Sequence, residues 1–157
     1  MKSVAVASPN HGSRPAGVSV DTVVLHADAA ANAQATVSWI RSKVSKVSYH
    51  ALIDRDGTVY RFVETSRRAW HCGPSAFDGR TDVNDFSLGL SFANRNDGAE
   101  PYTDAQYESA ALVLLGWMQL YPKITAARLT THAAIATPPG RKTDPMGFDL
   151  ERLKALL

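Results

Sequence analysis

The chain has 157 residues, of which 45% are hydrophobic and 20% charged, and its net charge is +2. This length and composition predict a globular protein with a sizeable core, so we expect residues 1–157 to form one domain, with residues 1–20 as an extended lead-in. The small charge argues against nucleic acid binding, and no window approaches the roughly 18 apolar residues needed to span a bilayer.

The composition also indicates a compartment. The single cysteine, Cys72, excludes an internal disulfide and suits a reducing environment. The N-terminus has one lysine and no sustained apolar run, which is not typical of a secretion signal. We therefore expect a protein that is cytoplasmic at synthesis, without stable membrane insertion, and we take it to be a monomer.

Hydrophobic periodicity and turn residues predict both strands and helices in the first half of the chain. An Asp-Gly turn at 54–57 indicates a hairpin between two of the strands. The expected elements are a buried strand at 22–26, a short helix at 36–43, a strand at 47–53, a hairpin strand at 58–63 and a loop at 68–80.

The second half contains the longest predicted helix. Thr103 and Gln106 form a capping-box pattern that opens this helix, which we expect to end near Tyr121. The other expected elements are strands at 86–94 and 128–131 and a terminal helix at 148–157, which begins at Asp149 and turns Leu153, Leu156 and Leu157 inward. Together the elements predict an α+β fold, with a central mixed sheet flanked by helices.

Residues 131–145 are the most informative segment, because Pro and Gly punctuate what we expect to be a constrained loop. This loop carries His132, Lys142 and Asp144, and the first predicted strand ends in a second histidine, His26. Two imidazoles and one carboxylate make a three-ligand zinc set that leaves a fourth position for water. The pattern indicates a hydrolase site. The alternative is that the same residues make only ordinary hydrogen bonds.

Six short motifs occur in order between residue 8 and about residue 149. They are Val24-Leu25-His26, Val47-Ser48-Tyr49-His50, Ile53-Asp54-Arg55-Asp56-Gly57, Arg68-Ala69-Trp70-His71, Asn84-Asp85-Phe86-Ser87-Leu88-Gly89-Leu90 and Gly140-Arg141-Lys142-Thr143-Asp144-Pro145. With these motifs the chain resembles the zinc-dependent N-acetylmuramoyl-L-alanine amidases of the type-2 family, which also includes peptidoglycan recognition proteins. Any one motif is weak support for the resemblance, whereas six in the same order are strong support.

The resemblance implies that His26, His132 and Asp144 hold one zinc ion, whose bound water has a pKa lowered to about 7. It also implies that Lys142 and Tyr49 are catalytic. Lys142 stands two residues before Asp144, on the same side of an extended segment, and its ammonium would stabilise an oxyanion. The phenol of Tyr49 would hydrogen-bond the attacking water. The alternatives are a solvated lysine and a tyrosine packed on the sheet.

Three further residues, His71, Trp70 and Cys72, lie outside this ligand and catalytic set. His71 matches a family position near the substrate cleft, so the resemblance implies substrate contact there and at Trp70, although Trp70 is as well suited to the core. His71 and Cys72 are an alternative metal pair. Adjacent side chains seldom both reach one ion, however, so we expect Cys72 to be a small buried residue.

Two departures from the family pattern affect the expected role. Bacterial anhydromuropeptide-recycling amidases carry a catalytic Glu where this chain has Ser91, and they have a long insertion where only 23 residues separate His26 from His50. Because Ser91 cannot act as a carboxylate base, activity is expected to depend on Tyr49 and Lys142. The short form is more similar to a phage endolysin.

The resemblance therefore implies a zinc amidase that cleaves the bond between N-acetylmuramic acid and L-alanine in peptidoglycan, as a phage or prophage endolysin acting on the cell wall. Two alternatives stay open. One is a cytoplasmic amidase that recycles soluble anhydromuropeptides. The other is a non-catalytic module that recognises peptidoglycan.

Overall fold

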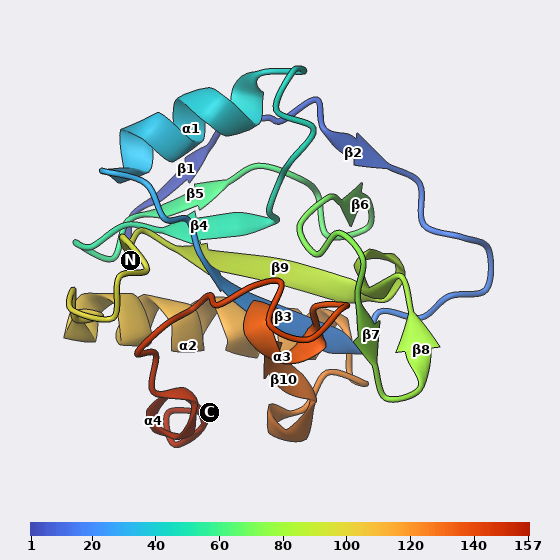
Figure 1. Ribbon diagram of the computed structural model, residues 1–157. Coiled ribbons are helices and arrows are strands. Elements are labelled where there is room, and N and C mark those ends of the chain that lie inside the picture. The colour runs from blue at the N-terminus through green and yellow to red at the C-terminus, as the bar shows by residue number, and fades with distance from the viewer.

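The computed structural model describes residues 1–157, and a six-stranded mixed sheet lies at its centre (Figure 1). The strand order is β1-β5-β4-β9-β3-β10. Strands β4, β9, β3 and β10 run parallel, β5 is antiparallel to β4, and β1 is parallel to β5. The strands are β1 (Ser3–Ala5), β3 (Thr22–Ala27), β4 (Ala51–Ile53), β5 (Val59–Arg61), β9 (Ser87–Phe92) and β10 (Leu129–Thr131). The predicted α+β fold is confirmed.

Helices cover both faces of the sheet. The long helix α2 (Asp104–Leu120) lies on one side and α1 (Ala33–Arg41) on the other (Figure 1). The short helix α4 (Leu150–Lys154) packs on the α2 side through Leu153, and α3 (His132–Ile135) packs on the α1 side through Ile135. None of these helices has the length and apolarity that a bilayer crossing requires.

The central strand β9 has two chemically different faces. Its sequence alternates small with large residues, and alternate side chains of a strand point to opposite faces. Leu88, Leu90 and Phe92 join the core cluster that includes α2 residues. The opposite face presents only Ser87, Gly89 and Ser91. These small residues leave space above the sheet, on the α1 side, for side chains from other segments.

The N-terminal segment, expected only to be extended, contributes two strands. Strand β1 pairs with β5 at the edge of the sheet, and β2 (His11–Gly12) pairs with β6 (Arg68–Ala69). Between them and β3, the half-buried guanidinium of Arg14 donates to the backbone carbonyls of Thr65, Asn84, Asp85 and Ser87. These four hydrogen bonds fix the segment to the body of the protein.

Helix α2 begins as predicted. The Thr103 hydroxyl accepts from the Gln106 amide, and the Gln106 side chain accepts from the Thr103 amide, so both halves of the capping box are present. Asp149 caps α4 as predicted, and Leu153 is fully buried. The inward orientation predicted for Leu156 is wrong: α4 ends at Lys154, and Leu156 is 45% exposed.

Short strands account for the other differences from the predicted secondary structure. The predicted loop at 68–80 contains β6 and a small hairpin of β7 (Ala76–Phe77) and β8 (Arg80–Thr81). Strands of two residues are too short to show a hydrophobic period, so the sequence pattern could not reveal them. The strand predicted at 47–53 forms its ladder only at Ala51–Ile53.

Candidate metal centre

Two predicted ligands lie at the carboxyl ends of parallel strands. His26 is near the end of β3, and His132 directly follows the neighbouring strand β10. In open α/β sheets the carboxyl ends of parallel strands are the usual place for a binding site. The two rings have centroids 4.6 Å apart, and Asp144 reaches them from the segment after α3. The structure therefore brings the predicted trio together, with all three ligand atoms within 4.8 Å of one another.

The hydrogen bond on the far side of His132 determines what the trio can bind. The Nε2 of His132 lies 2.9 Å from the carbonyl oxygen of Cys72 and must carry a proton to donate to it. In a neutral imidazole the Nδ1 is then unprotonated, yet it faces Asp144 Oδ1 at 3.0 Å. The contact therefore needs a positive charge, which either a second proton on His132 or a metal ion between the two side chains supplies. The donor set of two imidazole nitrogens and one carboxylate fits a zinc-type ion.

The electrostatics of the trio favour ligating protonation states. Burial lowers the pKa of His26 to about 4, although the Asp144 carboxylate opposes this shift. Burial alone would raise the pKa of Asp144, but hydrogen bonds with His132 and His26 hold it well below its usual range. At neutral pH His26 is therefore neutral and Asp144 is ionised, as metal binding requires.

The two residues expected to be catalytic lie beside the trio. The ring of Tyr49 is half-buried, with its centroid 5.1 Å from that of His26. Burial, reinforced by the carboxylates of Asp144 and Asp28, raises the pKa of Tyr49, so its phenol keeps its proton at neutral pH. Lys142 is exposed, and its positive charge contributes to lowering the pKa of His26. Both groups are therefore available next to the trio.

His132 does not lie in a loop, as expected, but on the helical turn α3. The Thr131 hydroxyl caps this turn by accepting from the Ala134 amide, and the Ala133 amide donates to the Asp144 carbonyl. This last bond ties the turn to the third ligand. A Thr followed by a His and two alanines is an N-cap pattern that predicts such a turn.

His71 lies behind His26, away from solvent. It is 4% exposed, and its Nδ1 is 3.0 Å from His26 Nε2. Its ring lies over Gly89, where an added Cβ would come within 2.6 Å of His71 Cγ. In the sequence, the small residues of β9 are the feature that indicates space for a side chain from another segment here. The Sγ of the buried Cys72 is 3.1 Å from the same Nδ1. The structure thus places His71 against a ligand, with no open face for substrate.

Trp70 and His50 lie apart from the trio. Trp70 is half-buried near Gly12, and its amide and carbonyl bond to Ser48. His50 is buried, and its Nδ1 accepts from the Gly89 amide. Its position agrees with the structural role expected from its place next to Tyr49 on the chain.

Ser91 pairs with His26 across β9 and β3, so the two side chains share one face of the sheet. Its hydroxyl is buried and has no hydrogen-bond partner. No carboxylate occupies this position.

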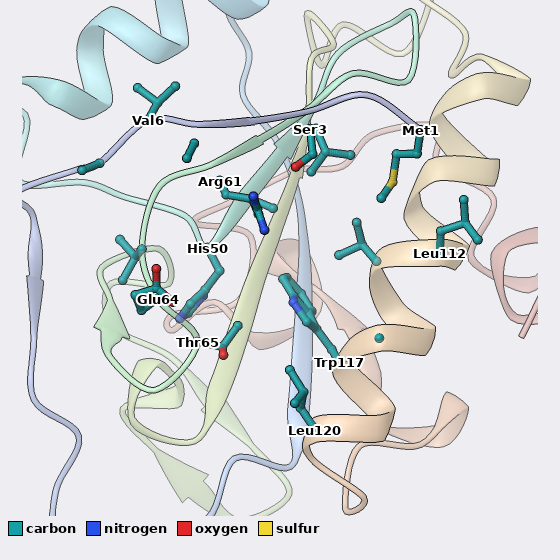
Figure 2. Close-up of a pocket in the computed structure, with 17 residues that line it drawn as sticks. Met1, Ser3, Val6, His50, Arg61, Glu64, Thr65, Leu112, Trp117 and Leu120 are labelled. Atoms are coloured by element: carbon teal, nitrogen blue, oxygen red, sulfur yellow. The ribbon is translucent and has the colours of Figure 1, made fainter.

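A cavity of about 560 Å³ lies elsewhere, between the β1 edge of the sheet and helix α2 (Figure 2). Met1, Leu112, Trp117 and Leu120 give it a mainly apolar lining. The only metal-ligating side chains in its lining are those of His50 and Glu64. The groups able to carry out chemistry are therefore at His26, not in this cavity.

Comparison with known proteins agrees with this geometry. The family described as N-acetylmuramoyl-L-alanine amidase matches residues 16–147. The chain belongs to this family. One relative in the amidase family is the 1,6-anhydro-N-acetylmuramyl-L-alanine amidase AmpD of Haemophilus influenzae, 44% identical over 108 residues, which are 68% of this chain. The match spans only 56% of the length of that relative.

Solved structures of amidases show the same fold. A crystal structure of a selenomethionine derivative of AmpD superposes with a TM-score of 0.81 at 33% identity, covering 99% of this chain and 94% of the other. The structure of AmpDh3 from Pseudomonas aeruginosa in complex with anhydromuramic pentapeptide has a TM-score of 0.76 at 26% identity, covering 90% of this chain and 61% of the other. The mixed sheet described above is thus an amidase fold.

Proposed function

We propose that this protein is a zinc-dependent amidase that hydrolyses the amide bond between N-acetylmuramic acid and L-alanine in soluble 1,6-anhydromuropeptides. The observation that carries the proposal is the convergence of His26, His132 and Asp144, whose ligand atoms lie within 4.8 Å of one another and form a zinc-type donor set. His26, His132 and Asp144 would hold the zinc ion, which would supply Lewis-acid chemistry at the scissile carbonyl.

The relatives favour the soluble substrate over the intact wall. The Haemophilus relative is named for the 1,6-anhydro form of the substrate, and the Pseudomonas structure holds an anhydromuramic peptide. The endolysin role expected from Ser91 and the short segment before His50 receives no such support. We therefore propose the recycling role, which was the alternative, and do not retain the endolysin role.

Two hydrogen bonds orient the histidine ligands. With Nδ1 of His26 facing the trio, its Nε2 carries the proton and donates to His71 Nδ1 at 3.0 Å. His132 is held in the same tautomer by the Cys72 carbonyl. Partners of this kind fix the ring orientation of a ligand and raise its basicity. In this proposal His71 is a positioning residue and does not bind substrate.

Tyr49 and Lys142 act on the substrate side of the trio. The phenol of Tyr49, protonated at neutral pH, donates a hydrogen bond to the oxygen that becomes negative when water adds to the carbonyl. The ammonium of Lys142 stabilises the same charge from the exposed side. Ser91 has no acid–base role, because a serine hydroxyl is not ionised at neutral pH.

The substrate is tested by supplying a soluble 1,6-anhydromuropeptide and purified sacculi to the zinc-loaded protein, with products resolved by mass. We expect peptides with a free N-terminal L-alanine from the soluble substrate, at a rate roughly tenfold or more above that from sacculi. Equal or faster release from sacculi would contradict the recycling role. Binding without release from either substrate would contradict the amidase itself and favour a recognition module.

A further inference from the structure

The imidazole of His26 faces a possible metal-ligand group with each of its two nitrogens. Its Nδ1 is 3.2 Å from Asp144 Oδ2, within the trio described above. On the other side of the ring, its Nε2 is 3.0 Å from His71 Nδ1, which is 3.1 Å from Cys72 Sγ. The ligand atoms of His26, His71 and Cys72 also lie within 4.8 Å of one another.

We propose that His26, His71 and Cys72 form a second metal site, selective for a soft divalent ion such as Cd²⁺, which competes with the first site for His26. The second site contains a thiol, whereas the first contains a carboxylate. Thiolate ligands favour soft ions, and binding at this site would release the thiol proton to solvent.

The ligand atoms lie close enough together to converge on one ion after a small outward movement. Zinc–nitrogen bonds of about 2.0–2.1 Å and zinc–sulfur bonds of about 2.3 Å place tetrahedral ligand atoms about 3.3–3.6 Å apart, and the larger Cd²⁺ needs a wider spacing. The observed separations of 3.0 and 3.1 Å are a few tenths of an ångström shorter than the zinc values, so the side chains must move apart when an ion enters. Adjacent His71 and Cys72 thus do converge, against the expectation from their positions in sequence.

The two sites share one imidazole, so they exclude each other. A neutral imidazole has one unprotonated nitrogen, and it can offer a lone pair from Nδ1 or from Nε2 but not from both. An ion bound at Nε2 leaves the proton of His26 on Nδ1, where it donates to Asp144. This competition rests on the proposed zinc trio, whereas the existence of the thiol site does not.

Burial separates the two sites kinetically. Of the residues that belong to one site alone, His71 and Cys72 are 4% and 1% exposed, whereas His132 and Asp144 are 5% and 8% exposed. The thiol is thus the most buried of these four groups, and an ion reaches it only when the structure opens locally. We therefore expect binding at the second site to be the slower of the two.

The site is tested by titrating the metal-free full-length protein with Cd²⁺ and recording ultraviolet thiolate-to-metal charge-transfer absorption. We expect a slowly developing band that saturates at one equivalent, is absent in Cys72→Ala and persists in Asp144→Asn. Cys72→Ser keeps the side-chain volume and serves if the alanine variant does not fold. Cadmium binding without a thiolate band in the folded wild type would overturn the proposal.

Competition is measured as zinc released to a chromogenic chelator when Cd²⁺ is added to zinc-loaded protein. We expect release of one zinc per protein, and a Cd²⁺ concentration for half-release that is raised roughly tenfold or more in Cys72→Ala. A thiolate band that develops while zinc stays bound would contradict the shared imidazole. A band in a protein without amidase activity would overturn the proposed function and leave the second site in place.

Discussion

At the scale of single residues, the proposed metal centre depends on a residue that has no side chain. Gly89 lies on β9 beneath the ring of His71, which in turn contacts His26. Because His71 Cγ is 2.6 Å from the position of an added Cβ, any larger residue displaces the ring. Gly89 thus controls the position of the proposed ligand His26 through one intervening residue, His71.

We expect Gly89→Ala to lower zinc affinity roughly 10–100-fold, because His26 loses the partner that orients it. The overpacking should also lower the free energy of unfolding by about 1–3 kcal/mol. Zinc titration and urea denaturation measure the two effects.

Gly116→Ala is the matched control, since Gly116 is helical and no atom lies within 4 Å of an added Cβ. There we expect unchanged zinc affinity and a gain of about 0.5–1 kcal/mol in stability. Unchanged zinc affinity in Gly89→Ala would contradict the positioning role of His71.

At the scale of elements, the short turn α3 joins two of the ligands. His132 is its first residue, and the Ala133 amide donates to the Asp144 carbonyl. The turn is capped by a single side-chain hydrogen bond, from the Ala134 amide to the Thr131 hydroxyl. The geometry of the trio therefore depends on one N-cap.

Thr131→Ala is expected to reduce the free energy of unfolding by about 1 kcal/mol and to weaken zinc binding, because the cap is lost. Thr125→Ala is the comparison, since Thr125 precedes the 3-10 turn Ala126–Arg128 and makes no side-chain cap bond. Calorimetry of both variants with and without zinc measures the effect. Equal changes in stability and in zinc binding in the two variants would show that the cap of α3 has no particular effect on the metal centre.

The sequence predicted the elements whose signals are local. The capping box at Thr103 and the Asp-Gly hairpin turn are read within a few residues, and both occur in the structure. The pairing of β2 with β6 and the carbonyl cluster around Arg14 join segments far apart in sequence, so no local pattern reports them. The contact of His71 with His26 has the same origin, since it depends on β9 packing beneath the His71 ring.

At the scale of the whole molecule, burial lowers the pKa of three histidines that lie against the sheet, His26, His50 and His71. His50 shows this best: burial, with a contribution from the Arg14 guanidinium, lowers its pKa to about 3. Its Nδ1 accepts from the Gly89 amide, and its Nε2 faces Arg14 and the Arg67 carbonyl. Protonation would break the first bond and place two cations side by side.

We therefore expect the metal-free protein to lose stability as the pH falls from about 6.5 towards 3. Over this range His50 binds a proton in the unfolded chain but stays neutral in the folded protein. Each pH unit therefore lowers the free energy of unfolding by at most roughly 1.4 kcal/mol per titrating group. Urea denaturation across this range measures the slope. His50→Gln should show a shallower slope, and an unchanged slope would assign the loss to other groups.

The most direct test of the account is the mass-resolved release of L-alanine-terminated peptide from a soluble 1,6-anhydromuropeptide by metal-free protein, before and after addition of one equivalent of zinc. We expect no release before addition and full activity after it in the wild type, and none in Asp144→Asn at the same zinc concentration. Activity in the rigorously metal-free wild type, or undiminished activity in zinc-loaded Asp144→Asn, would contradict the assignment of His26, His132 and Asp144 as the catalytic metal centre.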